Sequence, residues 1–310
     1  MHTILGANGV IARELSRVLD EQGKPVRQVS RNPRRVNRFD ELVRADLLDA
    51  RATADAVAGS EVAYLVAGLK YDLKVWREQW PRVMRNVIDA CKRHSCRLVF
   101  FDNVYAYGRV AGVMTEDTPF NPSSEKGEVR AEIARSLLHE MRTGNLQAMI
   151  VRAADFYGPG ATLSVTHATV FERLKAAKTP QWIGDPTTIH TFTFTPDAGR
   201  ALATLGQSDD AYGQTWHVPT TSEPWTGNDF VRAACEAAGQ PFRIQAAPRW
   251  LLRIMGVFVP VLRENIEMMY QFEHDYRFGS ARIEQAYGLR PTPYREGIAA
   301  TVDASQRPPD

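Results

Sequence analysis

The chain has few cysteines, little net charge and no patterned histidines. Cys91, Cys96 and Cys235 form no Cys-x-x-Cys pair, and their odd number argues against a disulfide framework and fits a reducing cytoplasm. The 38 basic and 36 acidic side chains leave a net charge of +2 and a pI of about 8.4, which excludes the bulk signature of nucleic-acid binding. The seven histidines lack metal-ligand spacing, so we expect no metal site.

Long apolar segments are missing as well. The longest apolar run, from Trp250 to Leu262, is interrupted by Arg253 and is too short to span a bilayer. The chain enters its first motif within six residues, which leaves no room for a signal peptide. We therefore expect a cytoplasmic protein with no membrane partner. With 310 residues, 44% hydrophobic and 24% charged, the chain suits one two-lobed domain or two associated domains.

The first 30 residues have the pattern of a βαβ unit. A short strand (Met1 to Leu5) precedes a glycine-containing turn, and apolar residues then recur at helical spacing. Gly23 occupies the position of a left-handed helix C-terminus, and Pro25 to Ser30 has the pattern of a second strand. The two strands are therefore expected to pair in parallel with a right-handed crossover.

The alternation of strands and helices continues to about residue 155. Further strands are expected at 62–66, 97–101 and 147–151, and helices from Pro81 onward and over 128–142. This predicts an α/β fold, a Rossmann-type doubly wound parallel sheet over residues 1–155.

Beyond residue 155 prolines cluster and the rhythm breaks. Residues 156–310 are predicted to form mainly a smaller α+β substrate lobe that contains a helix over 228–238. Segments near 188–220, for example Thr191 to Phe194 and Thr215 to Val218, are expected to return to the Rossmann sheet.

The turn after the first strand carries a glycine pattern typical of dinucleotide binding. Gly6, Gly9 and Ala12 match GxxGxxA, in which the first glycine allows a tight turn and the second lets the backbone approach a pyrophosphate. The alternative is a turn with no ligand. We expect the cofactor to contact the residues of this turn, namely Gly6, Asn8, Gly9, Val10 and Ile11.

The end of the second strand indicates which cofactor binds. A site that prefers NAD usually carries Asp or Glu here, whereas this chain has Ser30-Arg31-Asn32-Pro33-Arg34-Arg35. An arginine fork can bind a 2′-phosphate, so Ser30, Arg31 and Arg34 or Arg35 predict NADP, with NAD as a possible cofactor. The alternative is a solvated basic surface.

Several ordered motifs resemble the short-chain dehydrogenase/reductase superfamily, on its extended, epimerase/dehydratase-like branch. They are Ala45 to Asp49, Val104 to Gly108, Val151-Arg152 with Phe156 to Gly160, and the closing segments 282–289 and 292–298. The resemblance covers nearly the whole chain. It implies that Asp46, with Leu47, contacts adenine. It also implies that Ala67 and Gly68, which come just after a predicted strand, contact the cofactor.

The active centre departs from the family pattern. The family uses Ser or Thr four residues before the tyrosine of its VYG turn and a Tyr-x-x-x-Lys on the next helix. Here these positions become Asn103, Lys126 and Arg130, and no other tyrosine lies between residues 108 and 156. Asn103 could bind the substrate oxygen, Lys126 could be the acid, and Arg130 could bind the nicotinamide ribose. Lys126 and Arg130 are both also expected to contact the cofactor. The alternative for Lys126 and Arg130 is a solvated helix face.

Three functions remain open. The first is an NADP-dependent oxidoreductase acting on a small carbonyl or hydroxyl substrate. The second is a non-catalytic NADP-binding sensor, which the missing tyrosine motivates. The third is a nucleotide-sugar epimerase or dehydratase, disfavoured because those reactions depend on the tyrosine as base. A monomer or a homodimer is expected. Trp76 and Trp80 are expected in the core, while Tyr71 and Trp182 could line the substrate site.

Overall fold

The computed structural model describes residues 1–247 and 266–307, so the apolar run from Trp250 to Leu262 lies outside the described residues. The chain divides into two compact units. The first contains residues 1–106, 125–153 and 198–218, and the second contains residues 107–124, 154–197 and 219–310. Within the described part of the chain, no helix is both long and apolar enough to cross a membrane.

The first unit is built on a seven-stranded parallel sheet in the order β11-β7-β5-β4-β1-β2-β3. Its strands are β1 (His2–Leu5), β2 (Val26–Ser30), β3 (Glu41–Arg44), β4 (Val62–Leu65), β5 (Arg97–Asp102), β7 (Ala148–Arg152) and β11 (Thr215–His217). The predicted doubly wound parallel sheet is therefore confirmed. The central strands β1 and β4 are buried along their whole length, as expected for a sheet covered on both faces.

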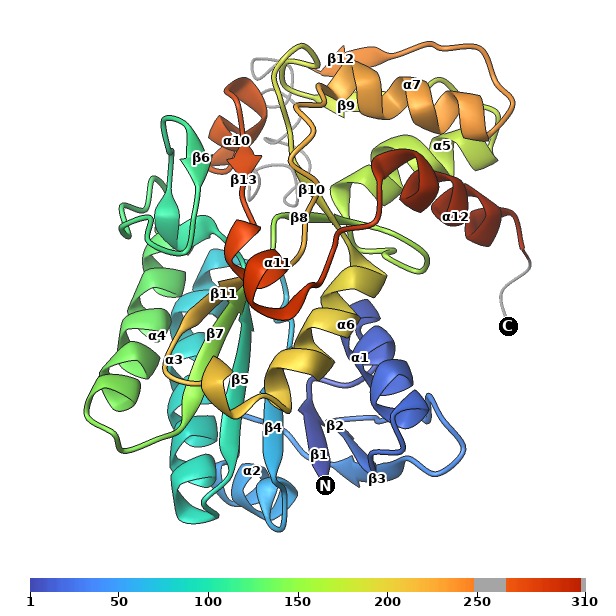
Figure 1. Ribbon diagram of the computed structural model, residues 1–310. Helices are drawn as coiled ribbons and strands as arrows, with labels where there is room; N and C mark the ends of the chain where they lie inside the picture. The colour runs from blue at the N-terminus through green and yellow to red at the C-terminus, as the bar shows by residue number, and fades with distance from the viewer. Residues whose placement is uncertain (248–265, 308–310) are drawn as a thin grey trace. The chain divides into compact units, whose positions relative to one another are not determined.

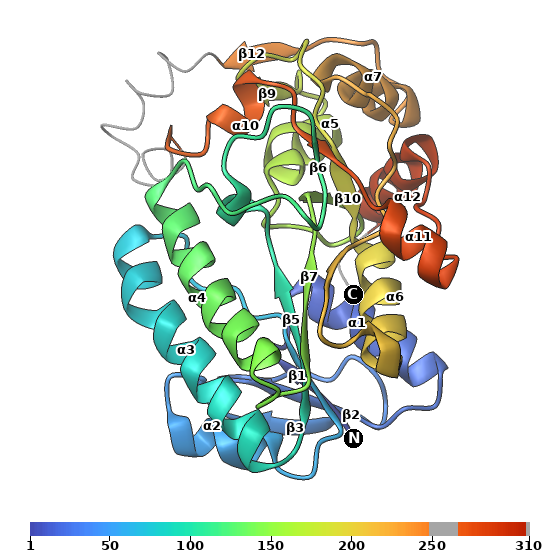
Figure 2. The ribbon, with the colours of Figure 1, turned by 60° about the vertical axis from the view of Figure 1, so that its left-hand side comes forward.

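Helices cover both faces of this sheet. On one side lie α3 (Leu73–Arg93) and α4 (Glu125–Arg142), with α2 (Ala50–Val57) packed on α3, and on the other side lie α1 (Val10–Glu21) and α6 (Thr195–Gly206) (Figures 1 and 2). Residues Ile11, Ala12, Leu15 and Leu19 form the buried face of α1. Gly23 has a φ of 69° after this helix, which confirms the predicted left-handed position.

The start of α3 differs from the prediction. The helix begins at Leu73 rather than at Pro81, because the Asp72 side chain accepts the backbone N–H of Val75 and caps the helix there. Pro81 lies inside the helix instead. Similarly α4 begins at Glu125, three residues before the expected start.

The second unit is a set of short elements around an aromatic core. Its strands are β6 (Val113–Met114), β8 (Asp155–Tyr157), β9 (Gln181–Ile183), β10 (Phe192–Phe194), β12 (Gln245–Ala247) and β13 (Arg277–Phe278). Its helices are α5 (Glu172–Lys175), α7 (Gly227–Ala237), α10 (Tyr270–Glu273), α11 (Ala281–Tyr287) and α12 (Tyr294–Gln306), with a π-helical turn at His167–Phe171 before α5. Rings of Tyr157, Phe192, Phe230 and Tyr294 pack together in its core.

One predicted return to the large sheet is confirmed and one is wrong. The segment from Thr215 to Val218 supplies β11, which pairs with β7. The segment from Thr191 to Phe194 supplies β10, which pairs with β8 in a separate two-stranded sheet. The buried side chains of both segments gave the sequence the same apolar pattern, which does not specify the strand partner.

Candidate functional site

The glycine turn brings the end of β1 against the end of β4. Gly6 has a φ of 104°, and a Cβ on it would lie 2.3 Å from the Cα of Ala67. Backbone N–H groups of Gly6 and Ala7 both donate to the carbonyl of Val29, which fixes the turn on β2. Glycine is therefore required at position 6 by both conformation and close approach.

The start of α1 is open and positively polarised. Gly9 is the N-cap and supplies no side chain to the free N–H groups, and the first turn carries no acidic residue. A Cβ on Gly9 would meet only the carbonyl oxygen of Gly6, at 3.8 Å. Bare glycine backbone at a helix N-terminus suits an anionic pyrophosphate, so these residues fit a dinucleotide. The side chain of Ile11 is in the core, which leaves its backbone for the cofactor contact that stays a prediction.

Asn8 joins the glycine turn to the loop after β2. Its φ is 81°, its Nδ2 donates to the carbonyl of Asn32 at 2.8 Å, and its Oδ1 accepts the backbone N–H of Arg34 at 3.0 Å. The same Nδ2 lies 3.4 Å from the hydroxyl of Ser30. The side chain of Asn8 thus holds the arginine-rich loop beside the glycine turn.

The loop over residues 31–40 presents arginines to solvent. Arg31, Arg34 and Arg35 are all exposed. Arg35 donates to the carbonyls of Arg38 and Asp40, at 3.2 and 2.6 Å, so its guanidinium also shapes the loop. The side chains of Arg31 and Arg34 make no hydrogen bond or ion pair within residues 1–247 and 266–307, and of the predicted arginines they are the most available for a phosphate.

The other predicted cofactor residues follow neighbouring strands. Asp46 lies just after β3, exposed, and its carboxylate accepts the backbone N–H of Leu48 at 3.0 Å. Leu47 is buried, and its carbonyl accepts from Asn86. Ala67 and Gly68 follow β4, with Gly68 exposed. Because the carboxyl ends of parallel strands meet at one edge of the sheet, these residues share that edge with the glycine turn.

Asn103 directly follows β5 at the same edge. Its Oδ1 accepts the backbone N–H of Tyr105 at 3.1 Å, and its own backbone N–H donates to Asp102 at 2.8 Å. Its Nδ2 makes no hydrogen bond to another described residue, and the side chain is half-buried. An amide N–H is thus left to donate to a substrate oxygen.

Lys126 lies in the first turn of α4 and is 1% exposed. Its Nζ is 4.8 Å from the ring centroid of Tyr71, within the range of a cation–π contact. Asp72 beside that tyrosine has a lowered pKa, chiefly because it accepts the N–H of Val75, with Lys126 among the lesser causes. A solvated helix face is therefore the wrong interpretation of Lys126.

Arg130, one turn further along α4, is held in a buried ion cluster. Its Nε donates to Asp102 Oδ1 at 2.8 Å and its Nη2 bonds the same oxygen, while Arg152 Nε donates to Oδ2 at 3.1 Å. The ring of Trp80 lies 4.4 Å from the guanidinium carbon. Arg130 is 4% exposed, so the solvated-face interpretation is wrong here too, and its guanidinium is engaged by Asp102.

Two features of the first unit escaped the sequence analysis. Asp102 is the acceptor for both buried arginines, although it lies 28 and 50 residues from them in the chain. Trp76 and Trp80 are buried, as expected, and they also line the side of Arg130. The sequence signal for this ion cluster was that the apolar run of β5 ends in Asp102. A buried acidic side chain usually has a positively charged or hydrogen-bonding partner.

The second unit contains a buried histidine–aspartate pair that the sequence analysis did not predict. His190 is buried, its Nε2 lies 3.0 Å from Asp155 Oδ2, and its ring stacks between Phe272 and Tyr276 at 4.5 Å from each. Trp182 contacts the same imidazole edge-on, so it is a core residue. A single histidine in an apolar stretch gives no sequence signal of such a pair.

A shallow surface groove also belongs to the second unit. It is lined by the 108–114 segment and by the 270–277 segment, including Arg109, His274 and Arg277. Among the described residues, no group of three or more His, Cys, Asp or Glu side chains could hold a metal ion.

A seven-stranded parallel sheet with helices on both faces and a glycine turn after its first strand defines a Rossmann-type fold. The chain belongs to the NAD dependent epimerase/dehydratase family, whose sequence model matches residues 2–218. The resemblance noted from the motifs is thereby confirmed. The coarse cofactor assignment, a nicotinamide dinucleotide, follows from this membership, and the chain is an enzyme of a family defined by NAD dependence.

Solved structures share the fold over nearly the whole chain. The UDP-glucose 4-epimerase of Thermus thermophilus, in complex with NAD, is 21% identical with a TM-score of 0.80 and coverage of 98% of this chain and 99% of that one. The dTDP-glucose 4,6-dehydratase of Streptomyces venezuelae, with NAD and TYD bound, is 18% identical, with a TM-score of 0.79 and coverage of 98% and 96%. No curated protein sequence matched the chain.

Proposed function

We propose that the chain is an NADP-dependent oxidoreductase that interconverts a carbonyl and a hydroxyl group on a small substrate. The observation that carries the cofactor choice is the Asn8 bridge, which holds Arg31 and Arg34 beside the pyrophosphate-binding turn. Two guanidinium groups there can form charge-assisted hydrogen bonds to a 2′-phosphate. No acidic side chain replaces them at the end of β2.

The remaining residues supply orientation and a proton. The bound nicotinamide would supply the hydride chemistry. Asn103 has a free amide N–H that can hold the substrate oxygen, and Lys126 takes the place of the family tyrosine as proton donor. Arg130 keeps α4 at the end of β5 through Asp102, so we assign it a positioning role and keep its ribose contact as a prediction.

The test compares two neighbouring cations of α4. Carbonyl compounds of varied size are incubated with NADPH, and NADPH oxidation is followed. Lys126→Met should abolish turnover with little change in NADPH affinity, because Lys126 gives up a proton and does not bind the phosphates. Arg130→Met should reduce both the turnover and the NADPH affinity, because it releases α4 from Asp102. Unchanged turnover in Lys126→Met removes this lysine from the mechanism.

A nucleotide-sugar epimerase or dehydratase is the second candidate, favoured by the family match and by the names of the structural neighbours. It requires another group to do the work of the missing tyrosine. Incubation with UDP-glucose or dTDP-glucose and NAD⁺, followed by NMR of the sugar, distinguishes it. Conversion of either sugar favours this candidate. No conversion of any substrate, with NADPH still bound, favours the sensor.

A further inference from the structure

The end of α3 folds back so that two cysteines meet. Ser95 has a φ of 50°, its N–H donates to the carbonyl of Lys92, and the N–H of Cys96 donates to the carbonyl of Cys91 at 2.9 Å. This pair of bonds is the Schellman motif, in which the residue after the turn contacts the residue three positions before the cap. The contact is made here by Cys96 and Cys91, whose spacing of five suggested no pairing in the sequence.

The backbone geometry fits a disulfide. The Cys96 nitrogen is one bond from its Cα, and the Cys91 carbonyl oxygen is two bonds from its Cα. A 2.9 Å hydrogen bond between these atoms therefore keeps the two Cα atoms within about 6.8 Å, the upper end of the disulfide range. Both side chains are buried beside this backbone contact, and the Cys96 thiol is near enough to contribute to the raised pKa of the Cys91 thiol.

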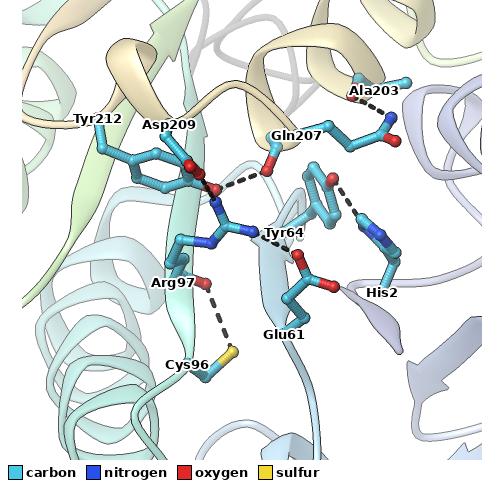
Figure 3. Close-up of polar contacts among 10 residues, drawn as sticks. His2, Glu61, Tyr64, Cys96, Arg97, Ala203, Gln207, Asp209 and Tyr212 are labelled. Carbon is cyan, nitrogen blue, oxygen red and sulfur yellow. Dashed lines mark hydrogen bonds and ion pairs between the residues drawn. The ribbon is translucent and has the colours of Figure 1, made fainter.

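The surroundings of the pair select a small oxidant. Cys91 is fully buried and Cys96 is 2% exposed. The Cys96 thiol donates to the carbonyl of Arg97, whose guanidinium is fixed by Glu61 and Asp209 (Figure 3). A thiol reagent as large as glutathione has no access to such sulfurs without local opening, whereas a molecule the size of water requires little.

We propose that Cys91 and Cys96 are a modification site, a dithiol that hydrogen peroxide converts to an intrachain disulfide. One thiolate attacks a peroxide oxygen, the O–O bond breaks, and a sulfenic acid forms as hydroxide leaves and takes up the thiol proton as water. The second sulfur then attacks the sulfenic sulfur, the S–O bond breaks, the S–S bond forms, and a second water leaves. Two thiols are oxidised, and one peroxide is reduced to two waters.

The reaction is expected to be slow at neutral pH and faster in base. The neighbouring Cys96 thiol, together with burial, raises the pKa of the Cys91 thiol. Because the thiolate is the nucleophile, the rate of disulfide formation should rise about tenfold per pH unit while both thiols remain protonated.

The experiment treats the folded protein with hydrogen peroxide, blocks remaining thiols under denaturing conditions and digests with trypsin. Cleavage at the basic residues around the turn separates residues 86–92 from residues 94–97, so a disulfide appears as these two peptides joined. The expected result is a joined peptide, two hydrogens lighter than the sum, that dithiothreitol splits. The oxidised protein should also unfold at a higher urea concentration.

Matched variants complete the test. Cys235→Ser, which removes the buried cysteine of the second unit, should leave the joined peptide unchanged, whereas Cys91→Ser and Cys96→Ser should each abolish it. The proposal is overturned if both thiols still react with the blocking reagent after the half-buried Met1 and Met141 are oxidised. It is equally overturned if the joined peptide forms only in urea.

Discussion

At the scale of single residues, Gly9 separates a conformational need from a ligand-binding need. Its φ of −67° and ψ of 159° are open to any amino acid. Among the described residues other than its two chain neighbours, the atom nearest to a Cβ at this position is the Gly6 carbonyl oxygen, at 3.8 Å. Neither the backbone conformation nor the packing of the fold therefore requires glycine at position 9, in contrast to position 6. The free space is what a pyrophosphate lying on the start of α1 would occupy.

Gly9→Val should therefore abolish NADPH binding and leave the fold intact. The branched side chain would fill the space above the free N–H groups of α1 without straining the backbone. Calorimetric titration gives the affinity, and a thermal melt followed by circular dichroism gives the stability. Normal binding by a folded Gly9→Val protein would mean that the loop is only a turn.

His2 is a second residue whose environment has a measurable consequence, namely a dependence of stability on pH. It is buried in β1, its Nδ1 is 3.0 Å from the hydroxyl of Tyr64, and burial lowers its pKa to about 4 (Figure 3). The unfolded chain binds a proton near pH 6.5, whereas the folded chain resists protonation until about pH 4. The stability that the protein gains from keeping His2 neutral and buried is therefore complete above pH 6.5. It is lost as the pH falls toward 4, because protonation then favours the unfolded chain.

Urea unfolding of wild type and His2→Gln across this pH range measures the effect. Between pH 7 and pH 4, the free energy of unfolding of wild type should fall by up to about 3 kcal/mol more than that of His2→Gln. Glutamine can keep a hydrogen bond to Tyr64 and does not titrate. Parallel pH curves for the two proteins would show that His2 is protonated freely in the folded state.

At the scale of elements, one carboxylate joins a helix to two strands. Asp102 ends β5 and accepts from Arg130 of α4 and from Arg152 of β7, with exposed side-chain fractions of 0%, 4% and 1%. Removing one partner of a buried ionic cluster leaves the others uncompensated, which is more costly than losing the attraction itself. The position of Lys126, one turn before Arg130, depends on this cluster.

Asp102→Asn should accordingly destabilise the protein by about 3–5 kcal/mol. Asp209→Asn is the matched control, because Asp209 also pairs with an arginine but its side chain is 95% exposed, and its loss should cost less than about 1 kcal/mol. Urea unfolding at pH 7 measures both. Equal effects of the two substitutions would contradict the role given to Asp102.

The elements themselves divide into those with local signals and those without. The βαβ unit, the glycine turn and Gly23 were predictable because each depends on residues within one turn or one alternation. The start of α3 was misplaced because proline is favoured at the first position of a helix, whereas the Asp72 side chain caps this helix earlier in the chain. Strand β3 was missed because its residues are mostly exposed. The strand at 191–194 was recognised, but its partner β8 was not, since pairing is not encoded locally.

At the scale of the whole molecule, the residues that follow the strand ends could be placed from the sequence, whereas the buried polar contacts within each unit could not. Gly6, Arg31 and Asp46 follow the ends of β1, β2 and β3, which are neighbours in the parallel sheet, and Asn8 bonds to the loop after β2. The contacts of Arg130 with Asp102, and of His190 with Asp155, join residues 28 and 35 apart with no common motif. Such contacts follow from the packed structure and cannot be derived from spacing.

The measurement that tests the central claim most directly is calorimetric titration of the protein with NADPH and with NADH. A charge-assisted hydrogen bond contributes about 1.5–3 kcal/mol, so NADPH should bind at least about tenfold more tightly than NADH. Arg31→Ala with Arg34→Ala should remove this preference. Arg38→Ala should retain it, because that exposed arginine of the same loop lies over Phe39. Equal affinity for the two cofactors in the wild type, or a preference that survives loss of both arginines, would contradict the account.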